Sequence, residues 1–189
     1  MRTRTGTTTH SLPLLALLLL GGICFAQERI TTLQAMAHGQ GNQVGMTIGV
    51  TITIDSYSTA EDRRAVWEAF DKGGEQGLVK AILAVPARGH LSFAGVADYE
   101  IAYIRVFPAP NGRKVRVVAR RPLPFGQARR YENLDYLFSA AEFDLNAEPG
   151  KSTGTFMPAC DLSINKDKEI EILTYQSPWG LDQVVAKGD

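Results

Sequence analysis

The sequence has few cysteines and histidines, no net charge, and no apolar run long enough to cross a membrane. Its 189 residues include 2 Cys and 3 His, and 20 Lys+Arg balance 20 Asp+Glu. Two cysteines exclude a small domain held together by many disulfides. A formal charge of zero argues against a basic nucleic-acid binder and against a disordered acidic chain. The composition is that of one ordinary globular domain.

Residues 1–26 have the pattern of a secretory signal peptide. Two arginines and no acid precede an apolar stretch from Leu12 to Leu20, and Cys24 and Ala26 place small residues at positions −3 and −1 of a cut before Gln27. We therefore expect a signal peptide cleaved after Ala26 and an exported protein, periplasmic or extracellular, with no stable membrane span after cleavage. A retained membrane anchor and lipid attachment at Cys24 are the alternatives.

Cleavage changes the charge and the thiol content of the chain. Removing 26 of the 189 residues leaves 163, and two of the 20 basic residues are lost with no acid, so the net charge becomes −2. Cys160 is then the single cysteine, which leaves no intramolecular disulfide, and a core must supply the stability. We expect this thiol to be a small buried hydrophobe rather than a nucleophile.

The first half of the mature chain predicts one strand and two helices. Residues 27–43 are polar and lack a period, which favours a flexible lead-in. Apolar residues alternate with Gly, Thr and Asp over 44–55, which predicts a half-buried strand. Apolar spacing then predicts a helix over 58–71, with a capping box formed by Ser58 and Glu61, and a second short helix over 78–85.

The second half of the chain is predicted to be strands. Asn111-Gly112 is a strong hairpin signal, and Pro158 requires its strand to be bulged or to lie at a sheet edge. The Pro149-Gly150 pair predicts a further turn. The expected strands cover 90–94, 98–107, 113–120, 134–145, 153–164 and 168–175.

This order predicts a single α+β domain over 44–189. We expect a β-α-α unit followed by a mostly antiparallel meander of five or six strands packed on a helical hairpin, or a half-open barrel. The strand over 98–107 is apolar on both faces, with Tyr99, Ile101 and Tyr103 on one side and Ile104 on the other. Either it is covered on both sides, or its second face lines a cavity.

The motifs of known chemistry are absent or out of context. Residues 150–154 match the Gly-x-Ser-x-Gly string of a nucleophile elbow, but they join two predicted strands where the elbow needs a strand-to-helix turn. The mature chain has only His38 and His90, without the spacing of metal ligands. We assign no catalytic residue, no metal and no cofactor. His90 with Cys160 or an aspartate would serve a hydrolase whose site is not recognised.

Positive charge is concentrated in one part of the chain. Between Arg113 and Arg130 there are seven basic residues and no acid. On the predicted strand, alternate positions place these bases on one face. We hypothesise an anion-binding site made by Lys114, Arg116, Arg120, Arg121, Arg129 and Arg130. The alternative is that the bases pair with acids on neighbouring strands, namely Glu100, Asp135, Glu142 and Asp144.

These observations favour binding rather than chemistry. We expect an exported soluble binding protein whose ligand is a small apolar, amphiphilic or anionic molecule, or a partner protein of the cell envelope. Nucleic acid is excluded as a partner by export and by the net negative mature charge. An envelope hydrolase and a purely structural or interaction protein are the competing classes.

Several short motifs carry a resemblance to other proteins. They are Asp55-Ser56-Tyr57-Ser58-Thr59 with Arg63, Gly89, Tyr99-Glu100-Ile101-Ala102-Tyr103, Asn111-Gly112-Arg113, Arg121-Pro122-Leu123, and Asp135-Tyr136-Leu137-Phe138 with Glu142-Phe143-Asp144-Leu145. In these segments the chain resembles a group of uncharacterised exported bacterial proteins. The resemblance implies export, and it implies no activity or site residues, because the group has none established.

Overall fold

The computed structural model describes residues 29–93, 96–123, 136–174 and 176–188. The strands are β1 (Ile30–His38), β2 (Thr47–Ile54), β3 (Gly89–Phe93), β4 (Val96–Ala109), β5 (Gly112–Ala119), β6 (Phe138–Asn146), β7 (Thr153–Ile164), β8 (Ile170–Leu173) and β9 (Trp179–Gly188). The helices are the short 3-10 helix η1 (Gly41–Gln43) and the α-helix α1 (Ala60–Ala84). The predicted signal peptide and its cleavage site lie outside the described residues.

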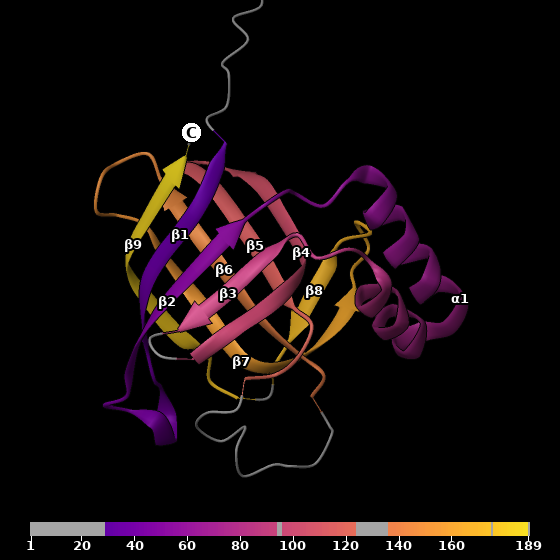
Figure 1. Ribbon diagram of the computed structural model, residues 1–189, viewed down its shortest axis with the longest axis horizontal. Coiled ribbons are helices and arrows are strands. Elements are labelled where there is room, and N and C mark those ends of the chain that lie inside the picture. The colour runs from indigo at the N-terminus through magenta and orange to yellow at the C-terminus, as the bar shows by residue number, and fades with distance from the viewer. Residues whose placement is uncertain (1–28, 94–95, 124–135, 175, 189) are drawn as a thin grey trace, which may run out of the picture.

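Eight of the strands form a closed antiparallel barrel (Figure 1). Neighbouring strands follow the order β6-β5-β4-β3-β2-β1-β9-β7, and pairing between β6 and β7 closes the ring. Strand β8 pairs with the second half of β7 and lies outside the ring. Closure pairs both edges of the eight-stranded sheet, and among the described strands β8 alone keeps a free edge.

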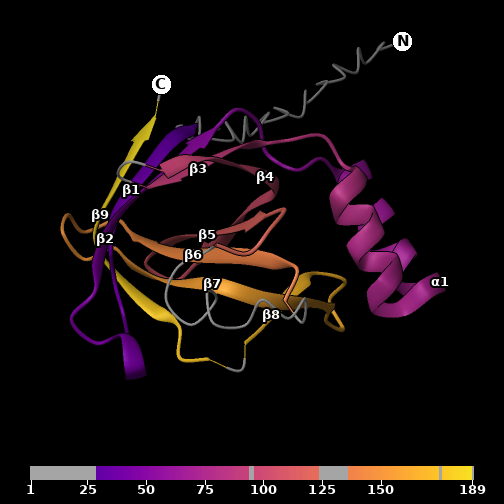
Figure 2. The same cartoon turned by 60° about the horizontal axis from the view of Figure 1, so that its bottom comes forward.

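The predicted α+β arrangement is wrong. The sheet packs on itself, where we expected it to pack on a helical hairpin, and the barrel is closed rather than half open. The two expected helices belong to the single element α1, whose helical dihedral angles are interrupted at Gly74 with φ 58° and ψ −146°. Figure 2 shows α1 beside the barrel, against its outer surface. The expected flexible lead-in over 27–43 contains β1 and η1.

Two separate hydrophobic cores result from this arrangement. The first fills the barrel, where inward positions of alternate residues meet. Its buried residues include Leu33, Ile52, Leu91, Ile101, Val117, Phe143, Phe156 and Trp179. The second lies between α1 and the outer face of β4 to β8, and it includes Val66, Leu78, Ile82, Tyr103, Val118, Phe138, Met157 and Cys160.

The two-sided apolar pattern of β4 is explained by these two cores. A register shift between Ile101 and Tyr103 places an extra residue in β4 relative to β5. Ile101 and Ile104 therefore pack inside the barrel, whereas Ala102 and Tyr103 pack under α1. The strand is covered on both sides, and strict alternation assigned Tyr103 to the wrong face because it could not include the bulge.

Two local predictions for the strands are confirmed. The predicted hairpin signal lies at the β4–β5 hairpin, whose turn residues are Pro110 and Asn111, between the paired Ala109 and Gly112. The β6–β7 register shifts between Phe138 and Ala140, opposite the segment of β7 that contains Pro158. The proline, which has no N–H to give to the ladder, therefore lies at a bulge. Within the described residues no helix combines the length and apolarity that crossing a membrane requires.

Candidate functional site

The predicted anion-binding residues on β5 are engaged with acids of neighbouring strands. Lys114 Nζ lies 3.2 Å from Asp144 Oδ1, and Arg116 Nη2 lies 2.6 Å from Glu142 Oε1. Each of these bases is also the cross-strand partner of the acid it contacts. The arrangement matches the alternative in which the basic run pairs with its neighbours.

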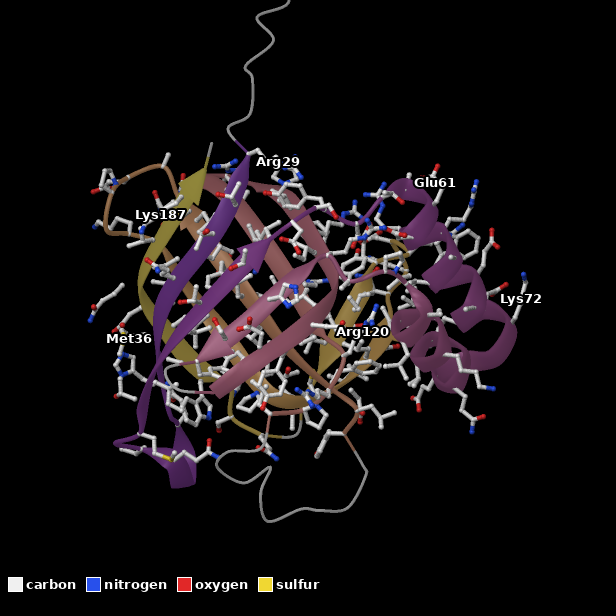
Figure 3. The ribbon with its side chains drawn as sticks, in the orientation of Figure 1. Arg29, Met36, Glu61, Lys72, Arg120 and Lys187 are labelled. Atoms are coloured by element: carbon white, nitrogen blue, oxygen red, sulfur yellow. The ribbon has the colours of Figure 1, made fainter. Side chains whose placement is uncertain are left out.

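The remaining residues of the predicted set are dispersed. Arg120 Nη1 lies 2.6 Å from Glu100 Oε2, and a second nitrogen of Arg120 donates to the carbonyl of Val85, just after α1. Figure 3 shows Arg120 on the side of the barrel that faces α1. Arg121 lies over the ring of Tyr99, with 4.3 Å between the guanidinium carbon and the ring centroid. The last two predicted residues, Arg129 and Arg130, lie outside the described residues, so an anion site in this run stays a prediction.

A different set of arginines meets in a pocket of about 420 Å³ at the rim of the barrel. Its lining comes from the start of the described chain, the β2–α1 linker, α1, β4 and β5. The lining residues are Arg29, Tyr57, Ser58, Arg63, Ile104, Arg105, Val106 and Arg113. Among these described residues four are arginines and none is acidic, so the pocket is cationic.

The β2–α1 linker is fixed against β4 by a pair of hydrogen bonds. The Ser58 N–H donates to the Ile104 carbonyl at 2.9 Å, and the Ile104 N–H donates to Ser58 Oγ at 3.0 Å. We had expected Ser58 to cap the helix with Glu61. The cap is instead formed one residue later by Thr59 and Asp62, because the Ser58 hydroxyl is used by β4. This pairing sets the position of the first turn of α1.

The first turn of α1 brings Arg63 to the pocket. The side chain of Asp62 accepts from the Thr59 N–H at 2.8 Å and also forms an ion pair with Arg88 in the segment before β3. The next residue, Arg63, is partly buried and forms no ion pair with any other described residue. Figure 3 shows Glu61 in this same turn. Asp62 thus fixes the turn to Thr59 and to Arg88, while Arg63 lines the pocket.

Arg105 is a partly buried cation of the pocket lining, with 23% of its side chain exposed. It forms an ion pair with Glu169, and its guanidinium carbon lies 4.8 Å from the centroid of the Phe107 ring. Burial lowers the pKa of the Arg105 guanidinium below its ordinary value, and the charges of Arg63 and Arg116 act in the same direction. Of these three guanidiniums, Arg105 is paired with Glu169 and Arg116 with Glu142, whereas Arg63 forms no ion pair with another described residue.

The other side of the pocket is built around Tyr57. Its hydroxyl donates to the Ile30 carbonyl at 3.0 Å, which ties the linker to β1. Burial raises the pKa of Tyr57, although the nearby charges of Arg113 and Arg29 oppose the shift. Arg29 donates to the Asp55 carbonyl at 2.8 Å and forms no ion pair with another described residue.

The sequence pattern does not indicate this pocket, because its arginines are far apart in the chain. Arg29 and Arg63 each stand beside or near acids in sequence, so neither belongs to a run of one charge. Arg105 and Arg113 flank the predicted hairpin, and this was the one available signal that two of them lie close together.

The residues considered for a hydrolase do not form a nucleophilic site. His90 Nε2 lies 3.8 Å from Asp55 Oδ2, and both side chains are about half exposed. Cys160 is fully buried in the core under α1, and burial raises the pKa of its thiol. Among the described residues no group of three or more His, Cys, Asp or Glu side chains is placed to hold a metal ion.

No protein family, curated protein or solved structure matches the chain.

Proposed function

We propose that the protein is an exported binding protein that holds a small anionic molecule in the pocket lined by Arg29, Arg63, Arg105 and Arg113. The observation that carries the proposal is the meeting of four guanidiniums from four parts of the chain around one pocket without a lining acid. Export rests on the leader pattern of residues 1–26 and on the resemblance to exported bacterial proteins.

Arginine is suited to this task because its planar fork donates two parallel hydrogen bonds to a carboxylate or a phosphate. Burial, and after it the charge of Arg63, lowers the pKa of the Arg105 guanidinium, so these two like charges lie close enough to repel each other. An anion placed among Arg63, Arg105 and Arg113 would relieve that repulsion. The binding free energy of the anion would therefore include the release of this repulsion.

The size of the pocket limits the ligand to a small molecule. A volume of about 420 Å³ lies at the lower end of the range of 300–1,000 Å³ that is typical of small-ligand sites. Beside its arginines, the pocket lining includes the apolar residues Ile104 and Val106. The pocket thus offers guanidiniums to the anionic group and an apolar surface to the rest of the ligand.

The test is the thermal stability of the purified chain in phosphate or citrate, compared with chloride at equal ionic strength. A ligand at 100 times its Kd stabilises the folded state by about 2.7 kcal/mol, which raises Tm by roughly 5–10 °C for a chain of this size. Arg63→Gln should remove most of this rise at little cost to the ligand-free Tm, because Arg63 makes no ion pair with a described residue.

Lys72→Gln is the matched control, since it removes one positive charge from a side chain of α1 that is 78% exposed. It should leave the rise in Tm unchanged. If Arg63→Gln keeps the full rise while Arg121→Gln removes it, the anion binds in the basic run after β5 and the proposed pocket is wrong. The absence of any anion-specific rise in the unmodified chain would also overturn the proposal.

A further inference from the structure

A second hollow of about 220 Å³ adjoins the arginine pocket. The two share Arg63 and Arg105 in their linings, so these two side chains form the boundary between them. The second hollow is lined in addition by Arg64 and Trp67 of α1 and by the turn before β8, and its lining residues are Ala60, Arg63, Arg64, Trp67, Arg105, Asp167, Lys168 and Glu169.

The second hollow is also cationic once its internal ion pair is taken into account. Of its two acids, Glu169 is engaged by Arg105 and accepts from the Tyr103 hydroxyl at 3.2 Å. Asp167 remains to balance Arg63, Arg64 and Lys168. The lining therefore keeps an excess of positive charge beside a pocket that is itself positive.

The turn that carries Lys168 is held in a fixed conformation. Asn165 Oδ1 accepts from the Asp167 N–H at 2.9 Å and from the Glu169 N–H at 3.1 Å, and the Asn165 carbonyl accepts from the Lys168 N–H at 3.0 Å. Lys168 has a φ of 59°, which a residue with a side chain adopts only where its surroundings enforce it. Its Nζ lies 3.8 Å from the centroid of the Trp67 ring. The ammonium group is thus placed at the wall of the second hollow.

From this geometry we infer that the ligand carries two anionic groups joined by a short spacer, one in each hollow, with the spacer crossing between Arg63 and Arg105. The inference rests on the proposed function and assigns the ligand class to it. One anionic group occupies the pocket with Arg29 and Arg113, and the second meets Arg64 and Lys168. A ligand with one anionic group uses only the first hollow.

The test measures affinity by calorimetry for methylphosphonate and for bisphosphonates with methylene, propylene and pentylene spacers. These bisphosphonates carry the same number of phosphonate groups, so their comparison separates spacing from total charge. We expect one of the longer spacers to bind at least about tenfold more tightly than methylphosphonate, because the second group binds as part of the same molecule. The double variant Arg64→Gln/Lys168→Gln should lose that gain and keep the affinity for methylphosphonate.

Lys72→Gln again serves as the control, because it removes a charge from α1 outside both hollows. Equal affinity for every spacer, or a gain that survives in the double variant, would overturn the inference while leaving the single-anion pocket intact. Failure of the proposed function has a different signature, in which methylphosphonate does not bind or binds equally well to Arg63→Gln.

Discussion

The ion pair between Arg88 and Asp62 makes the first turn of α1 a point where stability and ligand binding should change together. Only 15% of the Arg88 side chain and 13% of the Asp62 side chain are exposed. Arg88 Nη1 also lies 3.3 Å from Ser56 Oγ in the β2–α1 linker. Arg88→Met would keep the length of the side chain and remove the guanidinium, leaving a largely buried carboxylate without its cation.

The magnitude follows from the burial of the pair. Removing one member of a buried pair costs about 3–5 kcal/mol, and the small remaining exposure of both side chains favours the lower end, near 3 kcal/mol. For a chain of this size, that loss lowers Tm by about 6–12 °C. Anion affinity should fall as well, because the same turn positions Arg63.

The assay is thermal unfolding of the single variant and of the double variant Arg88→Met/Asp62→Asn. The asparagine retains an oxygen for the Thr59 N–H, which Asp62 accepts at 2.8 Å, but it carries no charge to desolvate. The double variant should therefore recover about 1 kcal/mol or more relative to Arg88→Met. If the two changes are additive, or if Arg88→Met shifts Tm no more than a surface substitution, the pair does not hold the turn.

Three further predictions concern other parts of the structure. Glu169→Gln should lower Tm and raise affinity for a single phosphonate, because Arg105 loses its counter-ion; unchanged affinity would separate Arg105 from the ligand. Burial raises the pKa of the Cys160 thiol, so the folded state keeps the thiol proton while the unfolded thiol ionises above about pH 8.5. The contribution of this thiol to the free energy of unfolding is therefore constant below that pH and falls by about 1.4 kcal/mol per pH unit above it. Denaturant unfolding of Cys160→Ala should lack this decline. Gly112→Ala would bring a Cβ within 2.0 Å of the Leu145 carbonyl oxygen and should lower the free energy of unfolding by about 4 kcal/mol. Gly150 has a φ of 76° and open space around it, so Gly150→Ala should lower it by only about 1–2 kcal/mol in the same measurement.

The strands that were predicted correctly have a clear period of two or a strong turn between them. The segment 44–55 contains β2, and the prediction 153–164 coincides with β7. Strand β1 was missed because its buried positions include Ala35 and Ala37, which give little hydrophobic contrast. Irregular register between β1 and β9 further obscures the period. Strand β9 was also absent from the predicted strands. Because β1 and β9 lie between β2 and β7 in the ring, the predicted strands could not indicate that the sheet closes.

The helical segments were recognised, but their packing was not. Apolar residues at helical spacing, such as Leu78 and Ile82, are buried as expected. Their partners are Tyr103 and Val118 on the outer face of the barrel, not the inner face of an open sheet. A hydrophobic stripe indicates that a helix packs against another element. The stripe does not indicate which face of a sheet the helix contacts.

The same distinction applies to charge. A run of bases shows where positive charge is concentrated in the sequence, but the register of the sheet decides which charges are compensated. Arg116 faces Glu142 across β6 and also faces Arg105 across β4, so one acid cannot serve both guanidiniums. Arg105 therefore takes its counter-ion from Glu169, which belongs to the turn before β8.

This arrangement explains why arginines without a lining acid gather at the rim of the barrel and not along the middle of β5. Lys114 and Arg116 of β5 each meet a carboxylate of β6 in register, whereas Arg113, which lines the pocket, is opposite Leu145. Arg29 and Arg63 come from the chain before β1 and from α1, where no strand partner is set opposite them. Neither arginine forms an ion pair with another described residue, and under the proposed function an anion that enters the pocket would balance their charges.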